Sequence, residues 1–299
     1  MANGTLRTIW KAVRQLSPGK VAREAERPFT MAIVGASAEE ITAIREFLLG
    51  PSPSEDVRCA ERVLRAYVTP LSDEQSREIR KADFVLATQG AGLDRITPLD
   101  LGNPQERVRA IASSRRGTDL RLALGLCLPA FRPEIARKIV REVSRENAVF
   151  VIATGLGDVL PSPLLPILGI VEAASDTMVL TANQVRMLFM LGAIYGVRVG
   201  YTSQWPEIGS IVAAAFGWRS LARELVAKIP LGGGLVPKGA VAYAGTMVMG
   251  EGLIFYYTTG RKMTRQEMQD AFKSAYSDAV ESVRSLVSRR SGRSGKASP

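Results

Sequence analysis

The sequence predicts an α/β fold, a small parallel sheet with helices, followed by a mostly α-helical hydrophobic domain. Between residues 28 and 100, short apolar runs alternate with helical patterns, which is typical of parallel strands joined by crossover helices. From Pro104 onward the pattern is helical, and long stretches after Asn147 carry almost no charge. We therefore expect a small sheet in the N-terminal part and packed apolar helices in the C-terminal part.

The chain divides into four predicted segments: a basic amphipathic N-terminal helix at 1–27, an α/β domain at 28–127, a helical domain at 128–283 and a disordered basic tail at 284–299. The first segment places apolar residues at helical spacing with basic residues between them; the apolar ones are Leu6, Ile9, Trp10, Val13 and Leu16. This stripe either lies on a membrane surface or packs on the rest of the protein. The tail, "SRRSGRSGKASP", has the composition of a disordered segment.

In the α/β segment we expect strands at 31–34, 63–68 and 84–88 and helices at 38–49 and 73–81. The stretch "GASAEEIT" (35–42) resembles a phosphate loop, because Gly35 and Thr42 stand at the first and last positions of G-x-x-x-x-G-K-[ST]. Glu40 and Ile41, however, replace the second glycine and the lysine. Ser37 and Glu40 instead match the capping box S-x-x-E. We expect a capped helix, a degenerate phosphate loop that binds neither GTP nor ATP tightly.

The other predicted elements are helices at 105–114, 133–145, 176–196 and 207–229. The stretch 119–132 alternates like a strand, but its Leu, Ala and Arg content favours a helix. Two further stretches, 149–171 and 239–257, are strongly apolar. A straight helix of 23 residues would span a bilayer, but Pro161, Pro163 and Pro166 interrupt the first stretch. We expect helical hairpins that enter one leaflet at most.

Composition excludes several kinds of chemistry. The chain contains no histidine, so Ser–His or Cys–His catalysis and histidine zinc sites are ruled out. Its two cysteines, Cys59 and Cys127, are far apart and form no paired motif, which suits a reducing compartment and argues against a disulfide scaffold. We expect no catalytic residue, no cofactor and no metal.

The net charge of +10 is concentrated at the two ends of the chain. Residues 1–29 carry six Lys/Arg and two Glu, and residues 284–299 carry five Lys/Arg and no acid. Basic ends suit an anionic surface, either lipid or nucleic acid, or they only keep the protein soluble.

The candidate site residues form a polar helix cluster: Asp176, Asn183, Gln184 and Arg186, all on the otherwise apolar predicted helix at 176–196. Such residues either bind an acidic group or line a helix interface. Polar groups in a packed bundle normally find protein partners, which favours a structural role as cross-links between helices.

The C-terminal half resembles a bacterial family of unknown function, the YcjF-type family. The matching stretches are "LPAFRPEIARKIVREVSRENAVFVIATGL" (128–156), "TANQVRMLFMLGAIYG" (181–196), "WRSLARELVAKIP" (218–230) and "KGAVAYAGTMVMGEGLIFYY" (238–257). This family is often linked to Era-like GTPase domains. The resemblance implies a helical, membrane-associated domain and no chemistry, and it makes 31–48 the remnant of a GTPase-like head, a pseudo-GTPase.

From these observations we expect a non-enzymatic membrane-associated protein, a scaffold or regulatory partner whose degenerate GTPase-like head lacks nucleotide motifs. It would act at the cytoplasmic face of the bacterial inner membrane or in the cytoplasm. The expected partner is a membrane surface or lipid, with a protein partner or a second copy of the chain as a further partner. The alternatives are a divergent nucleotide-binding hydrolase and a nucleic-acid-binding protein that uses its basic ends, and the lack of aromatic interleaving disfavours nucleic acid.

Overall fold

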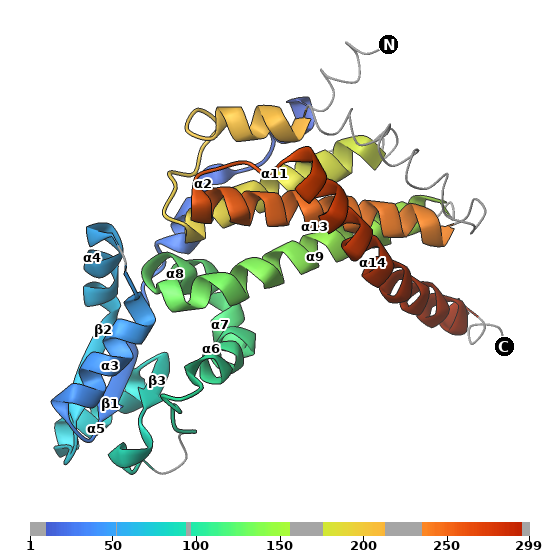
Figure 1. Ribbon diagram of the computed structural model, residues 1–299. Helices are drawn as coiled ribbons and strands as arrows, with labels where there is room; N and C mark the ends of the chain where they lie inside the picture. Colours follow the sequence, from blue (N-terminus) through green and yellow to red (C-terminus); the bar gives the residue numbers. More distant parts are fainter. Residues whose placement is uncertain (1–9, 52, 94–96, 156–175, 213–234, 295–299) are drawn as a thin grey trace. The chain divides into compact units, whose positions relative to one another are not determined.

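The computed structural model describes residues 10–51, 53–93, 97–155, 176–212 and 235–294 (Figure 1). The chain forms two compact units, and each is described here by itself. The α/β unit comprises residues 19–137 and 192–199, and the helical unit comprises residues 1–18, 138–191 and 200–299. The predicted fold class is confirmed at this level: a small three-stranded parallel sheet with helices precedes a mostly helical region.

The α/β unit alternates helices and strands much as the sequence predicts. Its elements are α2 (Pro18–Ala25), β1 (Met31–Gly35), α3 (Ala38–Leu49), α4 (Ser54–Val63), β2 (Leu64–Val68), α5 (Asp73–Lys81), β3 (Phe84–Ala87), η1 (Gln89–Ala91), α6 (Pro104–Ser113), α7 (Arg115–Asp119), α8 (Arg121–Cys127) and η2 (Pro129–Phe131). The bounds of α3 and α5 are those predicted, and α8 confirms the helix favoured within 119–132. Helix α4 was not expected, because its run is dominated by charged residues.

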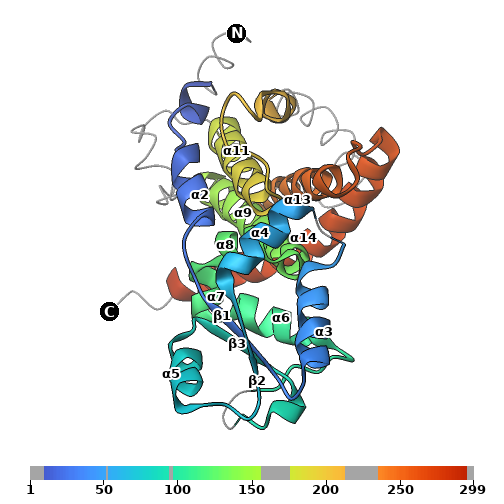
Figure 2. The same ribbon diagram turned by 90° about the vertical axis from the view of Figure 1, so that its left-hand side faces the viewer.

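The three strands are parallel and lie in the order β2-β1-β3, so β1 is the central strand. Every residue of β1 is buried. Because side chains alternate along a strand, Ala32 and Val34 face one side of the sheet, where they pack in a cluster with Ile79 of α5. Helix α3 also contacts β1, and Figure 2 shows α3 and α5 flanking the strands. The sheet is therefore covered by helices, as a parallel sheet requires.

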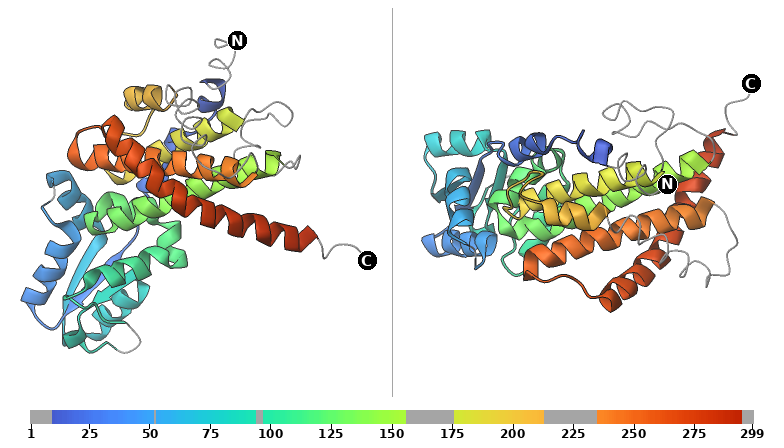
Figure 3. Two further views of the ribbon diagram at one scale, coloured as in Figure 1. Left: turned by 45° about the vertical axis from the view of Figure 1, so that its right-hand side comes forward. Right: turned by 90° about the horizontal axis from the view of Figure 1, so that it is seen from above.

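The helical unit contains residues 138–155 of α9 (Arg132–Gly155), followed by α11 (Asp176–Ile194), a helix at 205–212, α13 (Leu235–Thr259) and α14 (Arg265–Ser294). Helices α9 and α11 run side by side, and α13 and α14 form a hairpin (Figure 3). Helix α13 approaches α9 closely at Gly250, where an added Cβ would stand 2.5 Å from the Val140 side chain. Only glycine fits at this crossing.

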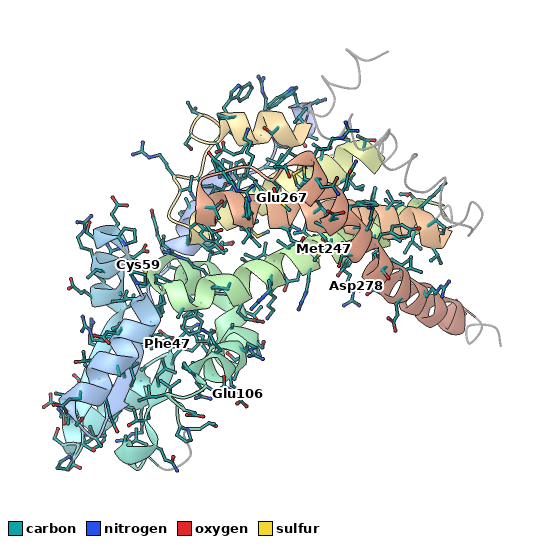
Figure 4. All side chains as sticks on the ribbon, viewed as in Figure 1. Phe47, Cys59, Glu106, Met247, Glu267 and Asp278 are labelled. Carbon is teal, nitrogen blue, oxygen red and sulfur yellow. A yellow bond between two sulfur atoms is a disulfide. The ribbon has the colours of Figure 1, made fainter. Side chains whose placement is uncertain are left out.

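Small residues pack the hairpin, as the sequence indicates for α13. Ala240 and Ala244 are fully buried in a cluster with Phe272 and Tyr276 of α14. Figure 4 labels Met247 on α13 and Asp278 on α14 along this hairpin. The small side chains let two helix backbones come close together, which is their usual role at helix interfaces.

Two expectations about the ends of the chain are settled by the structure. Helix α14 continues to Ser294, so residues 284–294 are helical where the composition predicts a disordered tail. Near the other end, Val13 and Leu16 are buried, and the Tyr201 hydroxyl donates to both of their backbone carbonyls, at 2.7 and 2.6 Å. This part of the apolar stripe packs within the helical unit. Leu6 and Ile9, the segment 156–171 and residues 213–229 lie outside the described residues.

Cys59 and Cys127 form a disulfide, with their Cα atoms 4.9 Å apart (Figure 4). The expectation that these cysteines argue against a disulfide is therefore wrong. A separation of 68 residues in sequence does not limit their distance in space, because α4 packs against α8. A partly buried ion pair supports the same contact: Arg132 Nη2 lies 2.7 Å from Asp56 Oδ1, and Arg132 Nε donates to the Gly125 carbonyl at 2.9 Å.

Breaking this disulfide should destabilise the α/β unit. A bond that closes a 68-residue loop stabilises a fold by about 2–4 kcal/mol, mainly by restricting the unfolded chain. We expect Cys59→Ala to lower the free energy of unfolding by that amount in oxidising buffer. The doubly substituted variant, which also carries Cys127→Ala, should behave like the single variant, and reductant should change neither. Recovery of both cysteines as free thiols from the purified wild type would contradict the assignment.

Candidate functional site

The first candidate site is the carboxyl end of the sheet in the α/β unit. In open α/β sheets, ligands bind where loops leave neighbouring strands toward opposite faces. Here β1 is flanked by β2 and β3, and the loops that follow β1 and β3 meet at this edge. The degenerate phosphate loop lies at this edge of the sheet. The contacts of the loop therefore show whether a phosphate has room to bind there.

The side chain of Glu40 fills this position. Ser37 Oγ accepts the Glu40 backbone N–H at 3.3 Å, which confirms Ser37 as the predicted N-cap of α3. The Glu40 carboxylate reaches further back than the capping box requires: its Oε2 accepts the Ala36 N–H at 2.7 Å and the Thr88 hydroxyl at 2.6 Å. Glu40 thereby joins the loop after β1 to the loop after β3.

Two glycines leave room for this carboxylate. A Cβ added at Gly35 would stand 3.1 Å from Glu40 Cβ, and one added at Gly90 would stand 3.3 Å from Glu40 Oε1. The Thr88 hydroxyl, and then the Ala36 N–H, lower the pKa of Glu40, so the group is ionised at neutral pH. A backbone N–H that would hold a phosphate in a working loop holds the protein's own anion here.

The second candidate site lies in the helical unit, where a buried polar cluster links three helices. Asn183 of α11 donates to Asn147 Oδ1 of α9 at 2.7 Å, and Asn147 donates to Thr246 Oγ1 of α13 at 2.8 Å. Gln184 donates to the same Thr246 oxygen at 3.4 Å, and the Thr246 hydroxyl donates to the Ala242 carbonyl at 2.8 Å. The three residues linked in series by these hydrogen bonds are at most 1% exposed: Asn183, Asn147 and Thr246.

The four residues predicted as one polar cluster have different surroundings. Asn183 and Gln184 belong to the buried chain of hydrogen bonds, whereas Arg186 pairs with Glu146 of α9 at a half-buried position. The side chain of Asp176 lies outside the described part of the molecule. Sequence reasoning missed Asn147 and Thr246. The only signal for them is that each is a polar residue on a helix face that is otherwise apolar.

Within the described residues, two polar atoms in or beside this chain of hydrogen bonds lack hydrogen-bond partners. They are Asn183 Oδ1 and the hydroxyl of Ser144, which is one turn before Asn147 on α9. The cluster holds no ionised group, and the described residues contain no group of three or more acidic or cysteine side chains that could hold a metal ion. Its chemistry is that of a cross-link between helices.

A third feature is an aromatic pair at the surface of the helical unit, in which Trp10 is half-buried and Trp205 is exposed. Trp10 and Trp205 stack with their ring centroids 4.8 Å apart and their planes inclined by 19°. Trp205 is 53% exposed, the most exposed of the large apolar side chains in the described residues. Lys11 and Arg14 follow Trp10 and are both exposed.

One described helix, α11, is long and apolar enough to cross a bilayer by length and composition, over Thr177–Ile194. Of that window, 83% is buried inside the protein. The core helix of a globular domain has the same length and composition, so this window alone does not assign a membrane span.

The Glu40 contacts should make the stability of the α/β unit depend on pH. Because the folded pKa of Glu40 is lowered, its stabilising effect is present above the unfolded pKa of about 4.3 and is lost as the pH falls through the folded value. We expect Glu40→Gln to lower the urea midpoint of unfolding at pH 7, and the difference from wild type to narrow below about pH 4. Glu46→Gln, at an exposed position on the same helix, is the control and should have no such effect. A pH-independent difference would contradict the assigned contacts.

Loss of the Thr246 hydroxyl should destabilise the helical unit. Thr246→Val preserves the shape of the side chain but leaves the amide groups of Asn147 and Gln184 without their acceptor. Each orphaned buried group costs about 1–3 kcal/mol, so we expect a loss of at least about 2 kcal/mol in chemical unfolding. Thr258→Val is the matched control, because Thr258 is exposed on α13 and its hydroxyl bonds only to carbonyls of its own helix. Equal effects of the two substitutions would contradict the cross-link.

Comparison with known proteins does not change this description. No family model, no curated protein and no solved structure matches the chain. The likeness of the C-terminal half to the YcjF-type family stays a prediction from the quoted sequence phrases.

Proposed function

We propose that this is a non-enzymatic protein that associates with an anionic membrane surface through its helical unit and serves as a scaffold or regulatory partner. The Trp10–Trp205 stack, in which Trp10 is half-buried and Trp205 exposed, is the observation that carries the proposal, together with the exposed Lys11 and Arg14. Tryptophan prefers the boundary between water and lipid, because its ring is apolar and its N–H is polar. Nearby basic side chains add attraction to anionic lipid.

The rest of the helical unit supports surface binding over a membrane span. The apolar stripe of the N-terminal segment is buried at Val13 and Leu16, so those residues are not available to lipid. In the same segment Trp10 is half-buried and Lys11 and Arg14 are exposed, and with the exposed Trp205 they form a compact surface patch. The family resemblance also implies a membrane-associated domain, and we place the protein at the cytoplasmic face of the bacterial inner membrane.

The disulfide affects the argument about location. Disulfides are rare in reducing compartments, so the bond between Cys59 and Cys127 removes cysteine usage as support for the cytoplasm. The proposed location therefore rests on the resemblance alone. Lipid is the proposed partner, and a protein partner or a second copy of the chain remains compatible with a scaffold.

For the α/β unit we propose a degenerate GTPase-like domain without nucleotide binding. The Glu40 carboxylate occupies the loop where a phosphate would lie, and the lysine position holds Ile41, which is buried. An incoming phosphate would meet a negative charge in place of a lysine. This supports a non-enzymatic role over that of a nucleotide hydrolase.

Binding to vesicles tests the proposed membrane patch. In a Trp218→Phe background, the remaining indoles are Trp10 and Trp205, and we expect their emission to shift to the blue on adding vesicles rich in phosphatidylglycerol. Reversing the charge of Lys11 or Arg14 should weaken partitioning at least fivefold, since each basic residue contributes about 1 kcal/mol near an anionic surface. Trp205→Ala should weaken it as well.

The matched control is Leu101→Ala, which removes an exposed apolar side chain from the α/β unit and should leave partitioning unchanged. Equal partitioning into neutral phosphatidylcholine vesicles would contradict the electrostatic part of the proposal. A blue shift produced by RNA, with none produced by vesicles, would favour the nucleic-acid alternative instead.

A further inference from the structure

A cavity of about 370 Å³ opens in the helical unit between the helix at 205–212, the second half of α13 and the start of α14. Its floor is formed by three buried apolar side chains, Ile211, Val248 and Leu253, which are 1%, 2% and 8% exposed. Three methionines also line it: Met249, Met263 and Met268. All of these residues belong to one unit of the chain.

The lining suits a flexible apolar ligand. Its volume lies within the range of about 300–1,000 Å³ that is usual for small-molecule sites. Methionine side chains are unbranched and polarisable, so they adapt to a chain that has no fixed shape. Met268 is 37% exposed, which is unusual for a large apolar side chain in the described residues and leaves it accessible at the cavity.

The charges of the lining favour an anionic head group. Lys262 and Arg265 line the cavity, are exposed, and form no ion pair with any carboxylate of the described residues. The neighbouring Arg261 is different, because it pairs with Glu267 at 2.7 Å where α14 begins (Figure 4). One carboxylate, Glu207, also lines the cavity, so the lining carries two cations and one anion.

We propose that this cavity binds a single-chain fatty carboxylate, with the acyl chain over the apolar floor and the carboxylate at Lys262 and Arg265. The two basic residues favour a ligand with an anionic head group, and the apolar floor favours an alkyl chain. The ligand binds as a monomer from solution. The proposal therefore goes beyond the membrane association proposed above and does not depend on it.

Chain length and head group provide the first test. Octanoate, decanoate and dodecanoate are titrated into the full chain by calorimetry, below their critical micelle concentrations and without vesicles. Each methylene that enters the cavity should tighten binding about fourfold, so two should give about fifteenfold. Dodecyltrimethylammonium should bind at least about tenfold more weakly than dodecanoate, because its head repels both cations. Absence of saturable binding, or equal affinity for the two head groups, would overturn the proposal.

Variants of α13 locate the site. A Cβ added at Gly252 would contact only Met263 Sδ, at 3.7 Å, so Gly252→Leu extends into the cavity and should weaken dodecanoate binding about tenfold or more. Gly245→Leu is the matched control on the same helix, where an added Cβ meets nothing within 4 Å. Both substitutions place a helix-favouring residue in a helix. Equal affinities in the two variants would place dodecanoate elsewhere and overturn the assignment.

Removing a basic or an acidic side chain from the cavity should change the affinity for dodecanoate in opposite directions. Lys262→Glu and Arg265→Glu should each weaken dodecanoate binding several-fold, and Glu207→Gln should tighten it by removing a like charge. Lys238→Glu, at an exposed position near the other end of α13, should have no effect on dodecanoate binding.

Methionine methyl spectra report on the cavity directly: the signals of Met249, Met263 and Met268 should move with added dodecanoate. If the cavity is instead filled by other residues of the chain or by a second copy, these signals will not respond, and the proposal fails.

Discussion

The alignment of three helices in the helical unit depends on one chain of buried hydrogen bonds, which runs from Asn183 of α11 through Asn147 of α9 to Thr246 of α13. Apolar helix faces with many small residues can slide past one another with little change in buried area. Buried amides cannot, since each requires a partner at one height along the neighbouring helix. Once this alignment is set, Gly250 of α13 meets Val140 of α9 and the close approach of these helices becomes possible.

The α/β unit solves a related problem with a charged group. Its central strand is wholly buried, and the loops at its carboxyl end would leave backbone N–H groups without partners. Glu40 satisfies one of them and also accepts the Thr88 hydroxyl, so a single side chain both caps α3 and joins two strand loops. A position that other proteins use for a ligand has here become part of the fold. In both units, therefore, a polar acceptor in an otherwise apolar setting determines the geometry around it.

Elements that short sequence patterns mark could be predicted. Features that depend on contacts between distant segments could not. Helices α3 and α5 have serine N-caps followed three residues later by Glu or Gln, and such caps define boundaries within the sequence itself. Helix α4 was missed because charged residues dominate it, and α14 extends through a segment whose composition resembles that of disordered tails. In the candidate site, Asn183 and Gln184 stood out as polar residues on an apolar helix. Their partners Asn147 and Thr246, the Cys59–Cys127 bond and the cavity at Met249 depend on which helices meet, and no local pattern encodes that.

The Cys59–Cys127 bond also determines how the α/β unit would respond to mechanical tension. Force applied between the two ends of the chain would pass directly from Cys59 to Cys127 through the sulfur atoms, so residues 60–126 would carry none of it. Strands β2 and β3 lie inside this closed ring, whereas β1, which is hydrogen-bonded between them, lies outside it. Tension on the α/β unit would therefore act on its central strand, while its two edge strands would stay tethered to each other within the ring.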